Sequence, residues 1–242
     1  MPSSAEFGYD ATTGTYLKTY ATTHHYHDWL LSIMQPYFGQ KVLEVGGGIG
    51  KVTPLLSARV PGELFTLEPS PEMFPTLRET VADLPNLRQV YAGTLQENQS
   101  KLANLGLDTL VYINVLEHIE EDERELEDAA ALLSPGGHVC TFSPALPALY
   151  SPRDRRVGHV RRYYLREKIK KMEAAGLEPV VAQYFDFTGS FLWWGKFVLL
   201  RSDAIGSGQV GFFDNVVVPL QRRLEPTWIP FGKNVLVIGR KK

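Results

Sequence analysis

The sequence predicts an α/β fold in which helices cover both faces of a mostly parallel sheet. Three observations predict this fold class. From Gln40 onward, short runs of β-forming residues alternate with longer helical patterns, which is typical of parallel sheets. The chain has 242 residues, of which 44% are hydrophobic, and this is enough for a substantial core. It contains no internal repeat, low-complexity tract or long polar linker, so we expect one domain over residues 1–242.

Seven segments have the composition of strands, which is a plausible number for one sheet. These predicted strands are residues 41–45, 63–67, 88–92, 109–114, 138–143, 178–185 and 234–239. Two helices between them have clear boundaries. Ser70 and Pro71 form a helix start, and the acidic segment 120–133 ends at the turn 135–137. Pro75 indicates an irregularity in the first of these helices.

Three segments outside the alternating pattern are rich in aromatic or basic residues. They are a helical segment at 16–37, the segment 145–163 after the fifth strand, and the segment 189–228 between the last two strands. In open α/β folds, loops that leave the carboxyl ends of strands surround the ligand. We therefore expect the first two segments to help build a lid over a ligand.

The charge balance and composition exclude several functional classes. Lys and Arg total 25 against 27 for Asp and Glu, so the net charge of −2 gives no overall attraction to nucleic acid. One cysteine, Cys140, leaves no internal disulfide and no cysteine-based metal framework. The N-terminus lacks a signal-peptide pattern, and the most apolar stretch, residues 191–200, is short and contains Lys196. We expect a cytoplasmic protein without a membrane span.

The segment 42–51 joins an apolar strand to four closely spaced glycines. Glycines permit positive φ and remove the Cβ, so this turn would pass under a ligand and offer it backbone amides. A tight turn without a ligand is the alternative. The spacing excludes a dinucleotide fingerprint, because Lys51 stands where the third glycine is required. It also excludes a P-loop, because Val52 follows Gly50 and Lys51.

Glu68 follows the second predicted strand directly, 20 residues after Gly48. A carboxylate at this place can accept hydrogen bonds from both hydroxyls of a ribose. Together with the glycine turn, it predicts a site for a nucleoside that carries no pyrophosphate. A solvated carboxylate at a strand end is the alternative.

The chain resembles the class I S-adenosylmethionine-dependent methyltransferases from about residue 16 to its C-terminus. It carries their Glu-x-Gly-x-Gly-x-Gly pattern at 44–50, and the segment 108–119, which contains Asn-Val-Leu-Glu-His-Ile, is similar to their fourth-strand motif. The turn at 133–137 resembles the one before their fifth strand, and 145–164 resembles a bacterial small-molecule subgroup. The resemblance implies a Rossmann-like, seven-stranded, mostly parallel sheet with an antiparallel last strand. It also implies S-adenosylmethionine as cofactor and S-adenosylhomocysteine as product.

The resemblance further implies which residues hold the cofactor. Residues 1–39 would form an N-terminal helical lid, 40–144 the cofactor-binding half, and 145–242 the substrate-side half with insertions. The implied cofactor-binding residues are Glu44, Gly46, Gly47 and Gly48 around the methionine part, Glu68 and Pro69 at the ribose, Thr94 and Leu95 at the adenine, and Asn114, Val115 and Leu116 at the sulfonium. Many relatives carry an Asp after the third strand, where Thr94 or a backbone group would substitute in this chain.

Methyl transfer from a sulfonium requires alignment of the acceptor and exclusion of water, and it demands no metal. We expect no metal site, and of His24, His25 and His27 only the first and last would share a helix face. If the acceptor is a hydroxyl or an ammonium, His118 and His159 are the candidate bases, because imidazole titrates near neutrality. The alternative for His118 is a structural role at the fourth-strand turn.

The segment 151–172 carries nine Lys or Arg residues and only two acids. Arg161 and Arg162 are candidates for binding a phosphate or carboxylate on the acceptor, whereas Lys168 is expected to face water. Ion pairs between this segment and the acidic 120–128 helix are the alternative.

Tyr26 and Trp194 are the aromatic candidates for the acceptor pocket, with core packing or a dimer surface as alternatives. The sequence thus predicts a methyltransferase that moves a methyl group by in-line SN2 transfer to a small-molecule acceptor, with an anionic group on the acceptor as one option. We expect a monomer or homodimer that does not bind nucleic acid. Two other functions stay open: a non-catalytic protein that binds a nucleoside and a partner on the same fold, and a protein or RNA methyltransferase.

Overall fold

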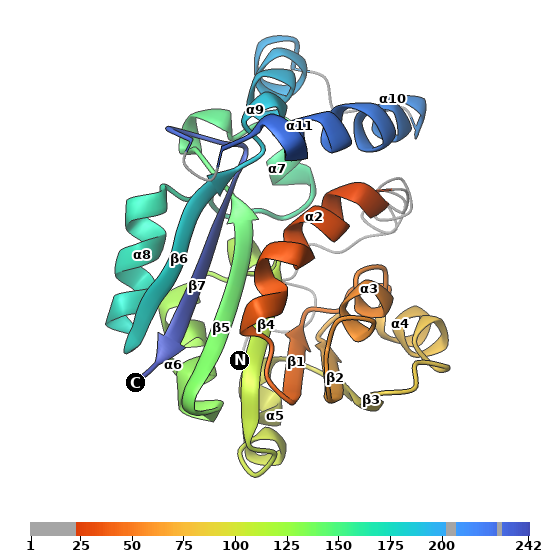
Figure 1. Ribbon diagram of the computed structural model, residues 1–242, viewed down its shortest axis with the longest axis vertical. Coiled ribbons are helices and arrows are strands. Elements are labelled where there is room, and N and C mark those ends of the chain that lie inside the picture. The colour runs from red at the N-terminus through yellow and green to blue at the C-terminus, as the bar shows by residue number, and fades with distance from the viewer. Residues whose placement is uncertain (1–22, 202–206, 227–228) are drawn as a thin grey trace.

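The computed structural model describes residues 23–201, 207–226 and 229–242, and its central feature is one seven-stranded sheet (Figure 1). The strands are β1 Lys41–Val45, β2 Glu63–Glu68, β3 Leu87–Ala92, β4 Leu107–Ile113, β5 Leu133–Pro144, β6 Leu177–Phe185 and β7 Asn234–Lys241. Their order is β3-β2-β1-β4-β5-β7-β6, and only β7 runs antiparallel to its neighbours. All seven predicted strands and the antiparallel last strand are confirmed.

Two apolar clusters hold the helices on opposite faces of the sheet. One contains side chains of α5 Leu95–Leu102, α6 Asp122–Leu132 and α8 Leu165–Ala174. The other contains side chains of α2 His24–Met34, α3 Thr53–Ser57 and α11 Val218–Leu224, together with Cys140 of β5. The central strands are buried from both sides, which explains why they are nearly continuous hydrophobic runs in the sequence. The edge strand β3 has only partly buried or exposed residues.

Two predicted helix boundaries are wrong. Residues 71–73 form turns, and α4 Phe74–Thr80 begins after them. The Ser70 carbonyl accepts a hydrogen bond from the Phe74 amide at 3.0 Å, so Ser70 does stabilise this helix start from outside. Pro75 lies in the first turn of α4, where the missing N–H leaves no helical hydrogen bond unmade. In the same way, β5 already begins at Leu133, because α6 passes directly into the strand.

A helical insertion connects β6 to β7. It consists of α9 Phe187–Trp193, a π-helical turn η6 Trp194–Leu199, α10 Ser207–Phe212, a second π-helical turn η7 Phe213–Val217, and α11. Figure 1 shows this insertion beside α7 Pro152–Arg156, beyond the carboxyl end of β5. Its exposed apolar side chains are Phe191, Leu192, Trp194, Leu199, Leu200, Phe212, Val216, Leu220 and Leu224. Among the described residues, no helix is both long and apolar enough to cross a lipid bilayer.

The predicted N-terminal lid can be followed only from Thr23. Its first part, with Tyr16 and Tyr20, lies outside the described residues, as does Trp228 of the insertion. The described part forms α2, followed by a short 3-10 helix, η3 Gln35–Tyr37. Because Tyr26, Trp29 and three further residues of α2 are buried, this helix is part of the core.

Two buried aspartates connect the insertion to α2 and β7. Asp214 accepts hydrogen bonds from the amides of His25 and Tyr26, at 3.1 and 2.9 Å. Asp186 at the end of β6 accepts the Gly189 amide at 2.8 Å and forms an ion pair with Lys233 at 2.7 Å. These contacts fix the insertion and α2 relative to each other.

Candidate functional site

The glycine turn between β1 and α3 has two sides with different surroundings. Gly46 and Gly48 have φ values of 76° and 59°, which are left-handed and favour glycine. A Cβ on Gly46 would stand 2.6 Å from the Val115 side chain, and one on Gly47 would stand 2.6 Å from the Thr66 hydroxyl. A Cβ on Gly48 would meet no atom of the described residues within 4 Å. The first two glycines therefore allow close packing, while Gly48 borders open space.

The amides of this turn are satisfied within the protein. Those of Gly46 and Gly47 both donate to the Leu67 carbonyl at 2.9 Å. The Gly48 amide donates to Glu68 Oε2 at 2.7 Å. The expectation that these three amides are offered to a ligand is therefore wrong for this structure, in which they hold the turn against the end of β2.

Glu68 lies where the sequence places it, at the carboxyl end of β2 beside the glycine turn. Its second oxygen, Oε1, accepts the Ser70 amide at 2.8 Å, and Pro69 beside it is partly buried. Burial raises the pKa of the Glu68 carboxyl to about 7, although its hydrogen bonds from Ser70 and Gly48 act in the opposite direction. Because a carboxylate has about four acceptor positions, two remain for the hydroxyls of a ribose.

Glu44 is buried under the turn. Its Oε2 accepts hydrogen bonds from the hydroxyls of Thr53 at 2.7 Å and Thr66 at 3.0 Å. Burial raises its pKa, and the two hydroxyls oppose that shift. Glu44 thus ties together β1, β2 and the start of α3.

Thr94 and Leu95, predicted at the adenine, begin α5. The Thr94 hydroxyl accepts the Glu97 amide at 3.2 Å, and Glu97 Oε2 accepts the Thr94 amide at 2.7 Å, which is a capping box. Leu95 is buried in the core. The Thr94 side chain therefore already has a structural role at this helix start.

Asn114, at the end of β4, has a left-handed backbone with φ of 55°, which is unusual for a residue other than glycine. Its amide donates to the Phe142 carbonyl at 2.8 Å. This bend places Val115 against the glycine turn and buries Leu116. The predicted sulfonium-side segment therefore lies next to the predicted methionine-side segment.

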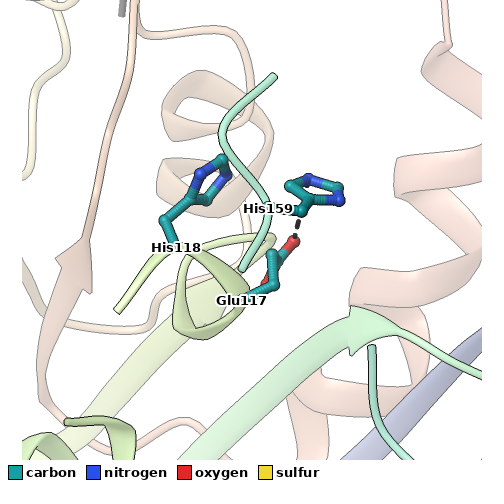
Figure 2. A group of neighbouring side chains, drawn as sticks. All are labelled: Glu117, His118 and His159. Carbon is teal, nitrogen blue, oxygen red and sulfur yellow. Dashed lines mark ion pairs between the residues drawn. The ribbon is translucent and has the colours of Figure 1, made fainter. Parts of the chain in front are cut away.

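His118 and His159, the two candidate bases, are neighbours in the structure, and the side chain of Glu117 lies close to both (Figure 2). Their ring centroids lie 4.8 Å apart in an edge-to-face arrangement. Burial, together with the charge of His159, lowers the pKa of His118 to about 3, so its ring is neutral at physiological pH. Glu117 is fully buried, and it was not among the site residues predicted from the sequence. The signal that could have identified it was its place directly before His118, shortly after the end of a predicted strand.

Asp154 organises the segment that carries His159. Its carboxylate accepts hydrogen bonds from His159 Nδ1 at 2.9 Å, Arg162 Nε at 2.8 Å and the Ser151 amide at 2.9 Å. Burial would raise the pKa of Asp154, but the bond from His159 and the charge of Arg162 lower it to about 2. Arg162 is itself buried, and its guanidinium lies 4.7 Å from the ring centroid of Trp193. Arg162, predicted to bind the acceptor, is thus engaged by Asp154.

Arg161 forms the ion pair that the sequence analysis gave as its alternative. Its Nη1 lies 2.5 Å from Asp122 Oδ1 at the start of α6. Lys171 pairs with the same oxygen at 3.0 Å and with Glu123 at 2.9 Å. Part of the positive charge of the 151–172 segment is therefore neutralised by α6.

Three more side chains for which the sequence predicted a role lie in three different environments. The Tyr26 hydroxyl donates to Asp186 and accepts from Asn234 in the core. Trp194 is half-exposed on the insertion. Lys168 does not face water as expected: it is fully buried, and its Nζ lies 3.3 Å from the Ser143 hydroxyl and 3.9 Å from the centroid of the Tyr163 ring. Burial lowers the pKa of Lys168 to about 7, although the charge of Glu117 opposes this.

Comparisons with known proteins agree with this fold. Residues 43–139 match a family model described as a methyltransferase domain. An uncharacterized methyltransferase of Mycobacterium tuberculosis is 28% identical over 124 residues, which cover 51% of this chain and 60% of the relative. The match thus spans less than two thirds of that relative's length.

Solved structures extend the likeness over most of the chain. A SAM-dependent methyltransferase from Archaeoglobus fulgidus has a TM-score of 0.60 at 16% identity, covering 88% of this chain and 92% of that one. The [4+2]-cyclase SpnF has a TM-score of 0.59 at 14% identity, covering 88% of this chain and 81% of that one. At these identities the likeness concerns the fold.

The strand order defines an α/β protein in which the glycine turn and the Glu68 carboxylate lie side by side at the carboxyl edge of the sheet. The methyltransferase-domain match covers residues 43–139 of this chain, and the fold is the one seen in structures of SAM-dependent methyltransferases.

Proposed function

We propose that this protein transfers a methyl group from S-adenosylmethionine to a small-molecule acceptor. The observation that carries the proposal is the open space at Gly48, bordered by the Glu68 carboxylate. The left-handed turn at Asn114 lies at the end of the neighbouring strand β4. This is the arrangement that a bound nucleoside with a short charged tail requires, because the ribose needs an acceptor and the tail needs a backbone without side chains.

In this proposal, Glu68 accepts the ribose hydroxyls and the segment Asn114–Leu116 lies beside the sulfonium. The transfer is an in-line displacement: the acceptor atom bonds to the methyl carbon while the carbon–sulfur bond breaks, and the electron pair stays on sulfur in S-adenosylhomocysteine. A hydroxyl or ammonium acceptor loses its proton to a base. His118 and His159 are the proposed bases, since His118 lies in the same short helix as Leu116 and the ring of His159 lies beside that of His118.

The acceptor is proposed to be a small molecule. Arg161 and Lys171 of the basic segment pair with acids of α6, and Arg162 pairs with Asp154, so these three cations do not contribute to a continuous basic surface of the kind that binds RNA. The same pairs leave Arg161 and Arg162 already engaged, so we do not assign an anionic group of the acceptor to them.

Calorimetry with S-adenosylmethionine and S-adenosylhomocysteine tests cofactor binding. Glu68→Gln should weaken binding by about 1 to 3 kcal/mol, because the amide cannot accept from the ribose and two backbone amides together. Glu63→Gln is the matched control: Glu63 is half-buried at the other end of β2 and pairs with Arg88, so this variant should bind like the wild type. A folded wild-type protein that binds neither compound would overturn the proposal.

The rival function is binding without methyl transfer. The same fold serves the [4+2]-cyclase SpnF, so the architecture alone does not decide. Release of S-adenosylhomocysteine on addition of candidate acceptors separates the two. Cofactor binding without turnover over a broad set of hydroxyl, amine and carbon acceptors would favour the binding protein.

A further inference from the structure

The side chains of Glu117, His118 and His159 form a compact cluster at the carboxyl end of β4. One ligand atom from each, a carboxylate oxygen or an imidazole nitrogen, lies within 4.8 Å of the others. Glu117 and His118 belong to the short helix η4 Leu116–His118, and His159 comes from the segment after α7. In Figure 2 the Glu117 carboxylate and the His159 ring are joined by an ion pair, with the His118 ring beside them.

The Glu117 carboxylate is buried in a place where its negative charge is only partly balanced. Its side chain has no exposed surface, and neither oxygen has a hydrogen-bond partner among the described residues, while the charges of His159 and Lys168 act on it from further away. The nearest imidazole nitrogen, His159 Nε2, is 3.9 Å from Oε1, which is too long for a hydrogen bond. Buried carboxylates are normally hydrogen-bonded, paired or bound to a metal ion.

Both histidines are oriented through Nδ1, which is how proteins position histidine ligands of metals. His159 Nδ1 lies 2.9 Å from Asp154 Oδ1, and His118 Nδ1 lies 3.2 Å from the Gly158 carbonyl. A carbonyl or a carboxylate accepts a proton from Nδ1, so coordination would use Nε2. Asp154 is itself held by Arg162 and Ser151, so the orientation of His159 is fixed from outside the cluster.

We infer that Glu117, His118 and His159 form a binding site for a divalent first-row transition metal ion. One carboxylate and two imidazoles suit zinc, manganese, iron or cobalt, whereas magnesium and calcium prefer oxygen ligands only. Bonds to such a metal are about 2.0 to 2.2 Å, so ligand atoms lie at most about 4.4 Å apart around it. A small side-chain rotation would bring the ligand atoms from their separation of up to 4.8 Å to this distance.

This site differs from the sequence-based expectation of no metal, because two of its ligands are adjacent in the chain and the third follows about forty residues later. Three protein ligands leave positions for other oxygen atoms. The role of the ion rests on the proposed methyl transfer. In that reaction, the ion would bind an acceptor that has a hydroxyl and a second oxygen donor. Coordination would orient that hydroxyl and favour loss of its proton to solvent before the oxygen attacks the methyl carbon. With the ion bound, the two histidines would act as ligands, and solvent would replace them as the proton acceptor.

Titration of the chelator-treated full chain with Co²⁺ tests the metal site directly. We expect a single equivalent to bind and to give the visible absorption bands of Co²⁺ with nitrogen and oxygen ligands. Zn²⁺ should displace it, and Mg²⁺ at similar concentration should not. Absence of these bands from a folded sample, or equal competition by Mg²⁺, would overturn the inference.

Matched variants locate the site. His159→Gln and His118→Gln should each lower the Co²⁺ affinity by about tenfold or more, with unchanged circular dichroism. His25→Gln is the control, because His25 of α2 also pairs with a carboxylate, that of Asp214 at 3.4 Å, but lies outside the cluster. Unchanged affinity in both test variants, or loss of affinity in His25→Gln, would place the metal elsewhere. Calorimetry with S-adenosylmethionine on the metal-free protein tests the proposed function separately.

Discussion

At the scale of single residues, the neighbouring glycines of one turn have different structural roles. Gly46 and Gly47 are required by the side chains that touch them, Val115 and Thr66. Gly48 has no such neighbour, although its φ of 59° is also left-handed. Packing therefore explains the first two glycines, while the third is explained by its backbone conformation, and the proposed cofactor would use the open space beside it.

Alanine substitutions separate these two roles. Gly46→Ala should lower the free energy of unfolding by about 2 to 4 kcal/mol, because a left-handed alanine costs about 1 to 2 kcal/mol and Val115 must also move. Gly48→Ala should lower it by only about 1 to 2 kcal/mol, since only the backbone is strained. The same variant should weaken S-adenosylmethionine binding, because the new methyl group enters the open space. Urea denaturation and calorimetry measure both effects, and equal destabilisation by the two variants would contradict this assignment.

At the scale of the elements, the start of α2 is stabilised from a distant part of the chain. Thr23 precedes this helix without a side-chain cap, and Asp214 of the insertion accepts two of its first amides instead. A carboxylate at a helix N-terminus also interacts favourably with the helix dipole. The insertion thus contributes directly to the stability of α2.

Asp214→Ala should lower the free energy of unfolding by about 1 to 3 kcal/mol, because the buried amide of Tyr26 and the partly buried amide of His25 lose their acceptor. Asp83→Ala, at an exposed aspartate, is the control and should change it by less than about 0.5 kcal/mol. Urea denaturation followed by tryptophan fluorescence measures both. A stability loss no larger than that of the control would show that the start of α2 does not depend on the insertion.

Elements were easier to predict from the sequence than contacts between them. The strands were predictable because buried parallel strands are short apolar runs bounded by turn residues. The position of Glu68 beside the glycine turn was predictable because this residue directly follows the second predicted strand, whereas its binding role stays a prediction. The pairing of Glu117 with His159, and of Asp214 with α2, depends on how loops fold back over the sheet, and local patterns do not contain that information. Lys168 was misplaced for the same reason, since its burial comes from Tyr163 and Ser143.

At the scale of the whole molecule, buried carboxyls make stability depend on pH. Glu125 of α6 accepts a hydrogen bond from the Tyr112 hydroxyl at 3.1 Å. Burial raises its pKa to about 7, although this hydrogen bond opposes the shift. Between the unfolded value of 4.5 and about 7, the folded chain binds a proton that the unfolded chain has released. Glu125 therefore contributes stability below about pH 4.5, and this contribution is lost as the pH rises through about 7.

Glu125→Gln should remove this component, because the amide stays uncharged at every pH. Relative to the wild type, the variant should gain stability as the pH rises from about 5 to about 8. Urea denaturation at the two pH values measures the difference. A difference between variant and wild type that stays constant with pH would mean that Glu125 is ionised in the folded protein throughout this range.

Cys140 gives the chain a built-in reporter. It is paired in register between Val111 of β4 and Ile238 of β7, and it has no exposed surface. Burial also raises the pKa of its thiol, so in the folded protein it is neither reachable nor a thiolate. A thiol reagent can therefore modify the chain only when the middle of the sheet opens, and the labelling rate counts those openings without any introduced probe. Ligands that bind only the closed form make these openings rarer by mass action and so slow the labelling. Reaction at one sulfur atom can therefore screen for cofactors and acceptors alike.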